Sequence, residues 1–131
     1  MIPQCIDQGV GLVPWSPLAR GLLAGSRTST GEQLTARAKT DPFLDSLYRP
    51  ELDVPVIDRA AEVAAEAGIS SAQVALAWLL QKPGVTAPIV GSTKVEHIEE
   101  ALAAESLSLS DEQIARLEEP YVAHPISGIE V

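Results

Sequence analysis

The pattern of apolar and polar positions along the chain predicts two short, buried strands. Residues 11–14 (Gly-Leu-Val-Pro) and 86–90 (Thr-Ala-Pro-Ile-Val) are almost continuously apolar, with no regular alternation. Such runs are typical of strands covered on both faces, as in parallel α/β sheets. Each run passes into a glycine-containing turn, at residues 15–21 and 91–94. Because ligands in α/β folds bind where strands end, the two turns predict one anion site built from adjacent strand ends.

The same pattern predicts helices around these strands. Residues 2–6 have the spacing of the last turns of a helix that Gly9 ends, so we expect the sequence to open within a βα unit. Apolar residues recur at helical spacing from 56 to 67. Asp53 is the expected cap of that helix, a proline falls in its first turn, and Gly68 ends it.

Capping boxes predict where three further helices begin. In a capping box, a Ser or Thr and a Glu or Gln three residues later each bond the other's backbone N–H group. The pairs in this chain are Ser70 with Gln73, Thr93 with Glu96, and Ser110 with Gln113. The helix over 72–81 is apolar nearly all round, so we expect it to be deeply buried, with Trp78 in the core rather than at a ligand.

Residues 24–52, between the first strand and the next helix, have no sustained period. This stretch is rich in Gly, Ser, Thr, Arg and Asp and contains two prolines. A connection of this length inside a compact domain is uncommon and is usually a lid or binding loop. Two interpretations stay open, a lid that folds back through residues 43–48 and a flexible insertion.

Composition narrows the classes of function. A chain of 131 residues, 46% of them apolar, is long enough for one domain with a core. The net charge of −9 argues against non-specific binding to nucleic acid, which needs a basic surface.

The single cysteine, Cys5, cannot form an internal disulfide and is expected to be a small buried hydrophobe. No apolar run reaches the length of about 18 residues that a membrane span needs, so we expect no membrane partner and a cytoplasmic location.

The second turn, Gly91-Ser-Thr-Lys94, has groups that suit a phosphate. It precedes a predicted helix N-terminus, where unpaired N–H groups favour an anion, and Lys94 adds a full positive charge. The spacing of glycine, lysine and hydroxyl differs from that of a Walker loop. Taken alone, such a turn is as often plain helix capping as phosphate binding, so both interpretations remain at this point.

Three longer motifs carry a resemblance to a known family. They are WSPLARGLL after the first strand, AQVALAWLLQKPGVTAPIVGSTKVEHIEEAL across a helix, strand and helix, and the closing PYVAHPISG. Together they resemble the aldo-keto reductases, and most of all the bacterial members related to the potassium-channel β-subunits. The resemblance covers essentially all of residues 1–131. It implies an α/β fold: a partial (β/α)₈ TIM barrel, the C-terminal part with strands 7 and 8 and their helices, and hence an incomplete domain.

The resemblance also implies a binding site for NADP(H). Trp15 stands where the family places an aromatic ring against the nicotinamide. The turn after strand 7, which holds the pyrophosphate, corresponds to Ser16, Pro17, Leu18, Arg20 and Gly21. The turn after strand 8, which takes the adenosine 2′-phosphate, corresponds to Gly91, Ser92, Thr93 and Lys94. Glu100 matches the acidic residue near the adenine amino group, whereas His97 stands where Arg or Gln is usual.

The activity that the resemblance implies is hydride transfer between NADP(H) and an aldehyde or ketone. The family's catalytic Asp, Tyr, Lys and His come from the first half of the barrel, and none of the motifs that carry them occurs here. We therefore assign no catalytic residue to this chain. Two alternatives stay open, a non-catalytic NADP-binding module and a purely structural fragment. A metal site at His97 and Glu100 is disfavoured, because on an acidic helix such a pair is usually a solvated face.

Two strands cannot close a barrel, which needs eight. The inner faces of both strands and the apolar helix would then lack neighbours. We therefore expect either an unusually exposed apolar surface or assembly with a partner. The partner would be a second copy of the chain or the missing N-terminal half of the barrel.

Overall fold

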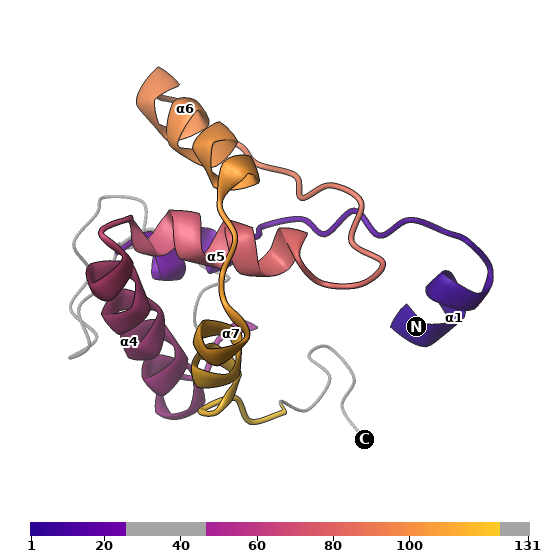
Figure 1. The fold of residues 1–131 in the computed structure, drawn as a ribbon, viewed down its shortest axis with the longest axis horizontal. Helices are drawn as coiled ribbons and strands as arrows, with labels where there is room; N and C mark the ends of the chain where they lie inside the picture. The colour runs from indigo at the N-terminus through magenta and orange to yellow at the C-terminus, as the bar shows by residue number, and fades with distance from the viewer. Residues whose placement is uncertain (26–46, 124–131) are drawn as a thin grey trace.

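The computed structural model describes residues 1–25 and 47–123, which form a helical bundle with two extended segments beside it (Figure 1). The elements in chain order are α1 (Ile2–Asp7), η1 (Ala19–Ala24), α4 (Pro50–Ala67), α5 (Ser71–Leu80), α6 (Val95–Ala103), η2 (Ala104–Ser106) and α7 (Asp111–Glu118). Helices α4, α5 and α7 pack together, while α6 extends away from them in Figure 1 and contacts α5 and η2. The order of helices agrees with the order that the sequence predicts.

The two extended segments run parallel but form two isolated bridges rather than regular strands. Leu12 pairs with Val85, and Trp15 pairs with Ile89. Two residues separate the bridges on the first segment and three on the second, so the second segment carries one extra residue. In place of the two strands that the pattern predicts, the described residues therefore hold an interrupted pair, and the predicted strand boundaries are not confirmed.

Two prolines explain the interruption. The N–H of Leu12 donates to the carbonyl of Gly84 (2.9 Å), and the N–H of Thr86 donates to the carbonyl of Leu12 (2.8 Å). A regular parallel ladder would next use the N–H groups of Pro14 and Pro88, but proline has none. Pairing resumes only where the N–H of Ile89 donates to the carbonyl of Pro14 (2.9 Å).

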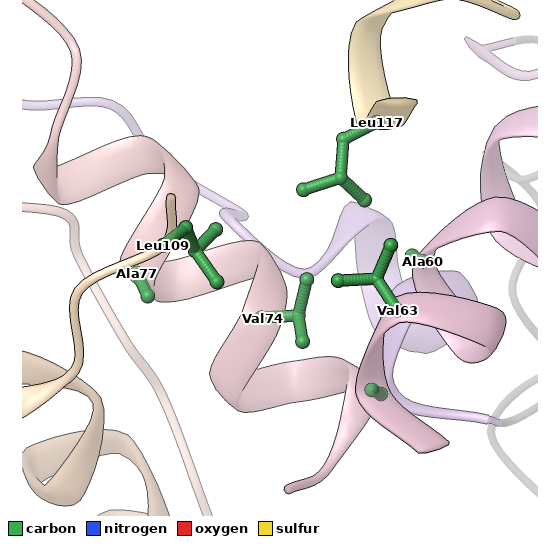
Figure 2. Close-up of a cluster of buried hydrophobic side chains, with 7 residues drawn as sticks. Ala60, Val63, Val74, Ala77, Leu109 and Leu117 are labelled. Atoms are coloured by element: carbon green, nitrogen blue, oxygen red, sulfur yellow. The ribbon is translucent and has the colours of Figure 1, made fainter. Parts of the chain in front are cut away.

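The core lies between α4, α5 and the chain around α7 (Figure 2). Its buried side chains are Ala60, Val63, Ala64, Val74, Ala77, Leu109 and Leu117. Trp78 is partly buried and packs against this cluster, which confirms the prediction that it belongs to the core. A smaller cluster forms where Leu22 of η1 packs against Ala19, Tyr48 and Ile57, and it joins the turn after the first segment to α4.

The capping boxes of α5 and α7 are confirmed. Ser70 Oγ accepts from the N–H of Gln73 (3.1 Å), and Ser110 Oγ accepts from the N–H of Gln113 (3.2 Å). In each box the glutamine side chain also accepts from the N–H of the serine. These boxes depend only on residues three apart, which is why the sequence pattern was sufficient to predict them.

Two predicted caps are wrong. The helix expected to begin after Asp53 begins at Pro50, because proline suits the first helical turn and Asp53 reaches back to accept from the N–H of Arg49 (2.6 Å). The capping box of Thr93 with Glu96 does not form; α6 begins at Val95 with Lys94 as N-cap and no side-chain cap.

The predicted lid-like loop, residues 24–52, lies largely outside the described residues, which omit 26–46. Its last three residues belong to α4, so the loop as predicted is too long at that end.

Among the described residues no single helix is long and apolar enough to cross a membrane. Helices α4 and α5 reach the required length and hydropathy only when taken together, but they are bent by 99° relative to each other, and both contribute to the core.

Candidate functional site

The bridge between Trp15 and Ile89 brings the two predicted ligand-binding turns to the same end of the paired segments. The first turn, residues 15–21, begins at Trp15 itself. The second turn, residues 91–94, begins two residues after Ile89. The parallel direction of the pair therefore places both turns at one edge, as the sequence predicts for adjacent strand ends.

The first turn is held in an uncommon backbone conformation. Three non-glycine residues have positive φ angles, Ser16 (52°), Ala19 (48°) and Arg20 (55°), and Gly21 follows at 99°. A non-glycine residue in this region costs about 1–3 kcal/mol, and such residues cluster at ligand-binding and active sites. The packing of Leu22 beneath the turn helps to maintain this geometry.

Hydrogen bonds inside the first turn hold its shape. Ser16 Oγ accepts from the N–H of Arg20 (3.2 Å), and the carbonyl of Ser16 accepts from the N–H of Ala19 (2.9 Å). Gly21 closes the turn by donating to the carbonyl of Leu18 (2.8 Å). Next to this ordered turn, the side chain of Trp15 is 66% exposed, so its ring is accessible to a planar ligand.

The second turn leads into the N-terminus of α6. Ser92 Oγ accepts from the N–H of Lys94 (3.0 Å) and donates to the carbonyl of Lys94 (2.9 Å). This places Lys94 at the N-cap of α6, whose first N–H groups receive no side-chain cap. Within the described part of the chain, the Lys94 ammonium group forms no ion pair. A helix N-terminus with an adjacent lysine can stabilise a phosphate or another anion.

The structure places the remaining predicted residues around these turns. Pro17 and Leu18 lie in the first turn and are half-buried, while Gly91 and Thr93 are exposed in the second. His97 is exposed in the first turn of α6, and Glu100 is half-buried one turn later. In the described ranges, no group of three or more His, Cys, Asp or Glu side chains is arranged to hold a metal ion.

One residue pair that supports the site was not singled out from the sequence. Gly11 lies so close to Thr86 that a β-carbon at position 11 would stand 2.2 Å from Thr86 Oγ1. A β-carbon at this position would therefore force Thr86 or one of the two segments to shift. A glycine inside a predicted strand was the available signal, because it often marks a close backbone approach.

A shallow recess lies at the opposite end of the paired segments. Its lining includes Cys5, Ile6, Gly9, Gly84 and Thr86. Cys5 is only half-buried there, so the structure does not confirm the full burial that the sequence predicts for it. None of the residues predicted to bind a cofactor lines this recess.

Comparison with known proteins identifies the family. A model of the Aldo/keto reductase family matches residues 1–121 of the chain. The chain belongs to this family. It is 46% identical over 129 residues to versiconal hemiacetal acetate reductase from Aspergillus parasiticus, covering 96% of this chain and 36% of that protein. It is 40% identical over 128 residues to the aldo-keto reductase AMT2 from Alternaria alternata, covering 98% of this chain and 34% of that protein.

A solved aldo-keto reductase has a similar fold. The thermostable enzyme Tm1743, crystallised with the inhibitor epalrestat, superposes with a TM-score of 0.59 at 28% sequence identity. The match covers 91% of this chain and 32% of the enzyme. This likeness is consistent with a partial barrel of the aldo-keto reductase type. The chain spans about a third of the length of the aldo-keto reductases that it matches.

Proposed function

We propose that residues 1–131 form the NADP(H)-binding part of an aldo-keto reductase barrel that reduces aldehydes or ketones to alcohols. The observation that carries the proposal is the parallel bridge between Trp15 and Ile89, from which both turns start at the same end of the paired segments. Family membership supports an oxidoreductase that acts on a small carbonyl compound. NADP(H) as the cofactor, a cytoplasmic location and the incomplete barrel are parts of the proposal.

The first turn suits the nicotinamide and pyrophosphate end of the cofactor. The exposed ring of Trp15 offers a flat apolar face for the nicotinamide. The left-handed conformation of Ser16, Ala19 and Arg20 is the kind of ordered, strained backbone that persists where a ligand is held. Pro17, Leu18 and Gly21 complete this turn, which would surround the pyrophosphate.

The second turn suits the adenosine 2′-phosphate. Lys94 and the uncapped N–H groups of α6 supply positive charge at one point. Ser92 holds the backbone of Lys94, and the exposed hydroxyl of Thr93 is a further donor. His97 and Glu100 on the following turn of α6 would lie on the adenine side. A 2′-phosphate on these groups would favour NADP(H) over NAD(H).

The chemistry of the two described turns would fit the cofactor, and the proposal assigns none of the described residues as proton donor for the carbonyl. When bound, NADPH supplies the hydride for the reduction. Trp15 would orient the nicotinamide ring and exclude water from one of its faces. Neither tyrosine among the described residues belongs to a turn of the site: Tyr48 packs against Leu22, and Tyr121 is exposed beyond α7. The proposal therefore assigns the proton donor to neither tyrosine.

Titration of the purified chain with NADPH tests the proposal, with tryptophan fluorescence as the readout. We expect saturable quenching, loss of the signal in Trp15→Ala, and binding about tenfold weaker or more in Lys94→Ala because a charge-assisted contact is removed. Lys94→Arg keeps the positive charge and is the matched control. Equal affinity for NADPH and NADH would contradict the assignment of the second turn to the 2′-phosphate.

A second readout separates binding from catalysis. The chain is incubated with NADPH and an aromatic aldehyde, and the absorbance of the reduced cofactor is followed. We expect no turnover by the chain alone, since the proposal assigns no catalytic residue to it. Turnover without added protein would show that the chain holds catalytic groups that this proposal does not assign.

A further inference from the structure

The strained backbone of the first turn needs support from the structure around it. Ser16, Ala19 and Arg20 all have positive φ angles, although each carries a β-carbon. Such a conformation persists only where its surroundings impose it. At the start of the turn, the bridge between Trp15 and Ile89 ties the chain to the second extended segment. The chain that follows the turn supplies a second support.

Two neighbouring leucines of η1 fix the far end of the turn. Leu22 is 4% exposed and packs against Ala19, Tyr48 and Ile57. Leu23 is partly buried and packs against the main core cluster. Through these contacts η1 rests on both α4 and α5. The strained residues therefore lie between two fixed points, a backbone bridge on one side and buried leucines on the other.

Ile57 links the turn to α4. Ala60 and Ala64 lie three and seven residues further along the helix, so all three side chains share one face of it. Ala60 and Ala64 pack in the main core, whereas Ile57 packs against Leu22. Tyr48 also packs against Leu22, but it precedes α4 and is not held by helical hydrogen bonds. Ile57 is therefore the contact that couples a regular helix to the turn.

We propose that Ile57 is a positioning residue for cofactor binding, which acts through Leu22 to hold the first turn in its left-handed conformation. The inference rests on the proposed function, which assigns the pyrophosphate to this turn. Without the Ile57 side chain, Leu22 loses a packing partner and the turn gains relaxed conformations. The apparent affinity for a ligand falls in proportion to the fraction of molecules in the binding conformation. Ile57 thus affects the affinity for the cofactor although it belongs to neither turn.

Amide hydrogen exchange of the full chain without cofactor tests the support of the turn. The N–H groups of Ala19, Arg20 and Gly21 are hydrogen-bonded within the turn. In Ile57→Ala we expect these groups to exchange about fivefold faster or more, because the turn opens locally more often. Ile114→Ala is the matched control, since Ile114 is also partly buried but packs against the main core from α7. It should leave the exchange of these groups unchanged.

Calorimetric titration with two probes tests the effect on binding. The probes are NADPH and adenosine 2′-monophosphate, which lacks the pyrophosphate and the nicotinamide. Ile57→Ala should bind NADPH about fivefold more weakly or more and adenosine 2′-monophosphate with unchanged affinity, because the second turn is proposed to take the 2′-phosphate. Ile114→Ala should bind both probes as the unmodified chain does. Ile57→Val removes a single methylene group, so it gives an intermediate effect with less risk to folding.

Three results would overturn the inference. The first is equal exchange of the turn amides in Ile57→Ala and Ile114→Ala. The second is an unchanged affinity of Ile57→Ala for NADPH when the unmodified chain binds it. The third is an equal loss for both probes, which indicates general damage rather than a change in the first turn. Failure of the unmodified chain to bind NADPH is a different result, because it overturns the proposed function and with it the link from Ile57 to the cofactor.

Discussion

The ammonium group of Lys82 lies 4.8 Å from the centroid of the Trp78 ring, and both side chains bond the carboxylate of Glu118 on α7. The indole N–H of Trp78 donates to Glu118 Oε1 at 2.9 Å, and Lys82 forms an ion pair with the same oxygen. This cluster joins the end of α5 to the end of α7. It also gives Trp78 a surrounding quite different from that of the exposed Trp15.

Replacing Glu118 tests this cluster. Glu118→Gln keeps an acceptor for the indole but removes the ion pair, whereas Glu118→Ala removes both. Because the pair is partly exposed, we expect Glu118→Gln to lower the free energy of unfolding by about 1 kcal/mol or less, and Glu118→Ala to lower it more. Urea unfolding followed by circular dichroism measures both. Equal effects of the two variants would show that the indole bond contributes nothing.

Gly11 lies so close to Thr86 that adding one methyl group at position 11 should lower the stability of the protein. Gly11→Ala places a β-carbon 2.2 Å from Thr86 Oγ1, so one segment must shift or the Thr86 side chain must rotate. We expect a loss of about 1–3 kcal/mol in the free energy of unfolding. The double variant Gly11→Ala/Thr86→Ala should recover most of this loss, whereas Gly11→Ala/Thr86→Ser should not. Additive effects in the first double variant would contradict the predicted contact.

The left-handed turn at Gly21 gives a prediction about backbone strain. Its φ of 99° lies in a region that residues with a β-carbon rarely adopt. We expect Gly21→Ala to lower the free energy of unfolding by about 1–2 kcal/mol and to weaken binding of NADPH. Gly91→Ala is the stability control, since a β-carbon there would meet no atom within 4 Å. An unchanged free energy of unfolding in Gly21→Ala would show that the backbone of the turn can adjust to a β-carbon at little energetic cost.

The capping box of α5 predicts that replacing Ser70 destabilises the protein more than replacing the adjacent Ser71. Ser70→Ala removes the acceptor for the N–H of Gln73 and should cost about 1 kcal/mol in the free energy of unfolding. Ser71→Ala, one residue later, removes no cap and should change stability by less than about 0.5 kcal/mol. Thermal unfolding of the two variants side by side measures the difference. Similar losses in both would contradict the cap.

Three carboxylates that join α7 to its neighbours predict a loss of stability in acid. The pKa of Glu66 is lowered by hydrogen bonds from Arg116, that of Glu119 by a hydrogen bond from Arg59, and that of Glu118 by Lys82 and then Trp78. A carboxylate whose pKa is lowered on folding stabilises the protein above its unfolded pKa, and this contribution disappears as pH falls through the folded value. Stability should therefore decline below about pH 4.3, the ordinary glutamate pKa.

Equilibrium unfolding at a series of pH values measures this dependence. Glu66→Gln should make the decline less steep, since one proton fewer is taken up on unfolding in acid. Glu51→Gln, on α4 but outside these ion pairs, is the matched control. An unchanged slope in Glu66→Gln would show that the bidentate contact of Arg116, at 2.6 and 2.9 Å, does not persist in solution.

Local patterns predicted most of the helices and the order of the site residues. The caps at Ser70 and Ser110 followed from residues three positions apart, and the positive φ of Gly9 and Gly68 followed from their places after apolar periods. The wrong caps share one cause. Helices α4 and α6 begin after Arg49 and Lys94, neither of which forms a side-chain cap, so a polar residue at the expected spacing did not mark where these helices begin. The likeness to members related to potassium-channel β-subunits stays a prediction.

The sequence by itself determined the family, the helices and the two turns that are proposed to bind a cofactor, because motifs and caps depend on neighbouring residues. Only the tertiary structure decided how the two segments that lead into these turns are paired. The bridge between Trp15 and Ile89, the extra residue in the second segment and the contact of Gly11 with Thr86 join positions more than seventy residues apart. This pairing depends on which backbone N–H groups can still donate, because Pro14 and Pro88 have none. It also depends on how closely the two backbones can approach each other.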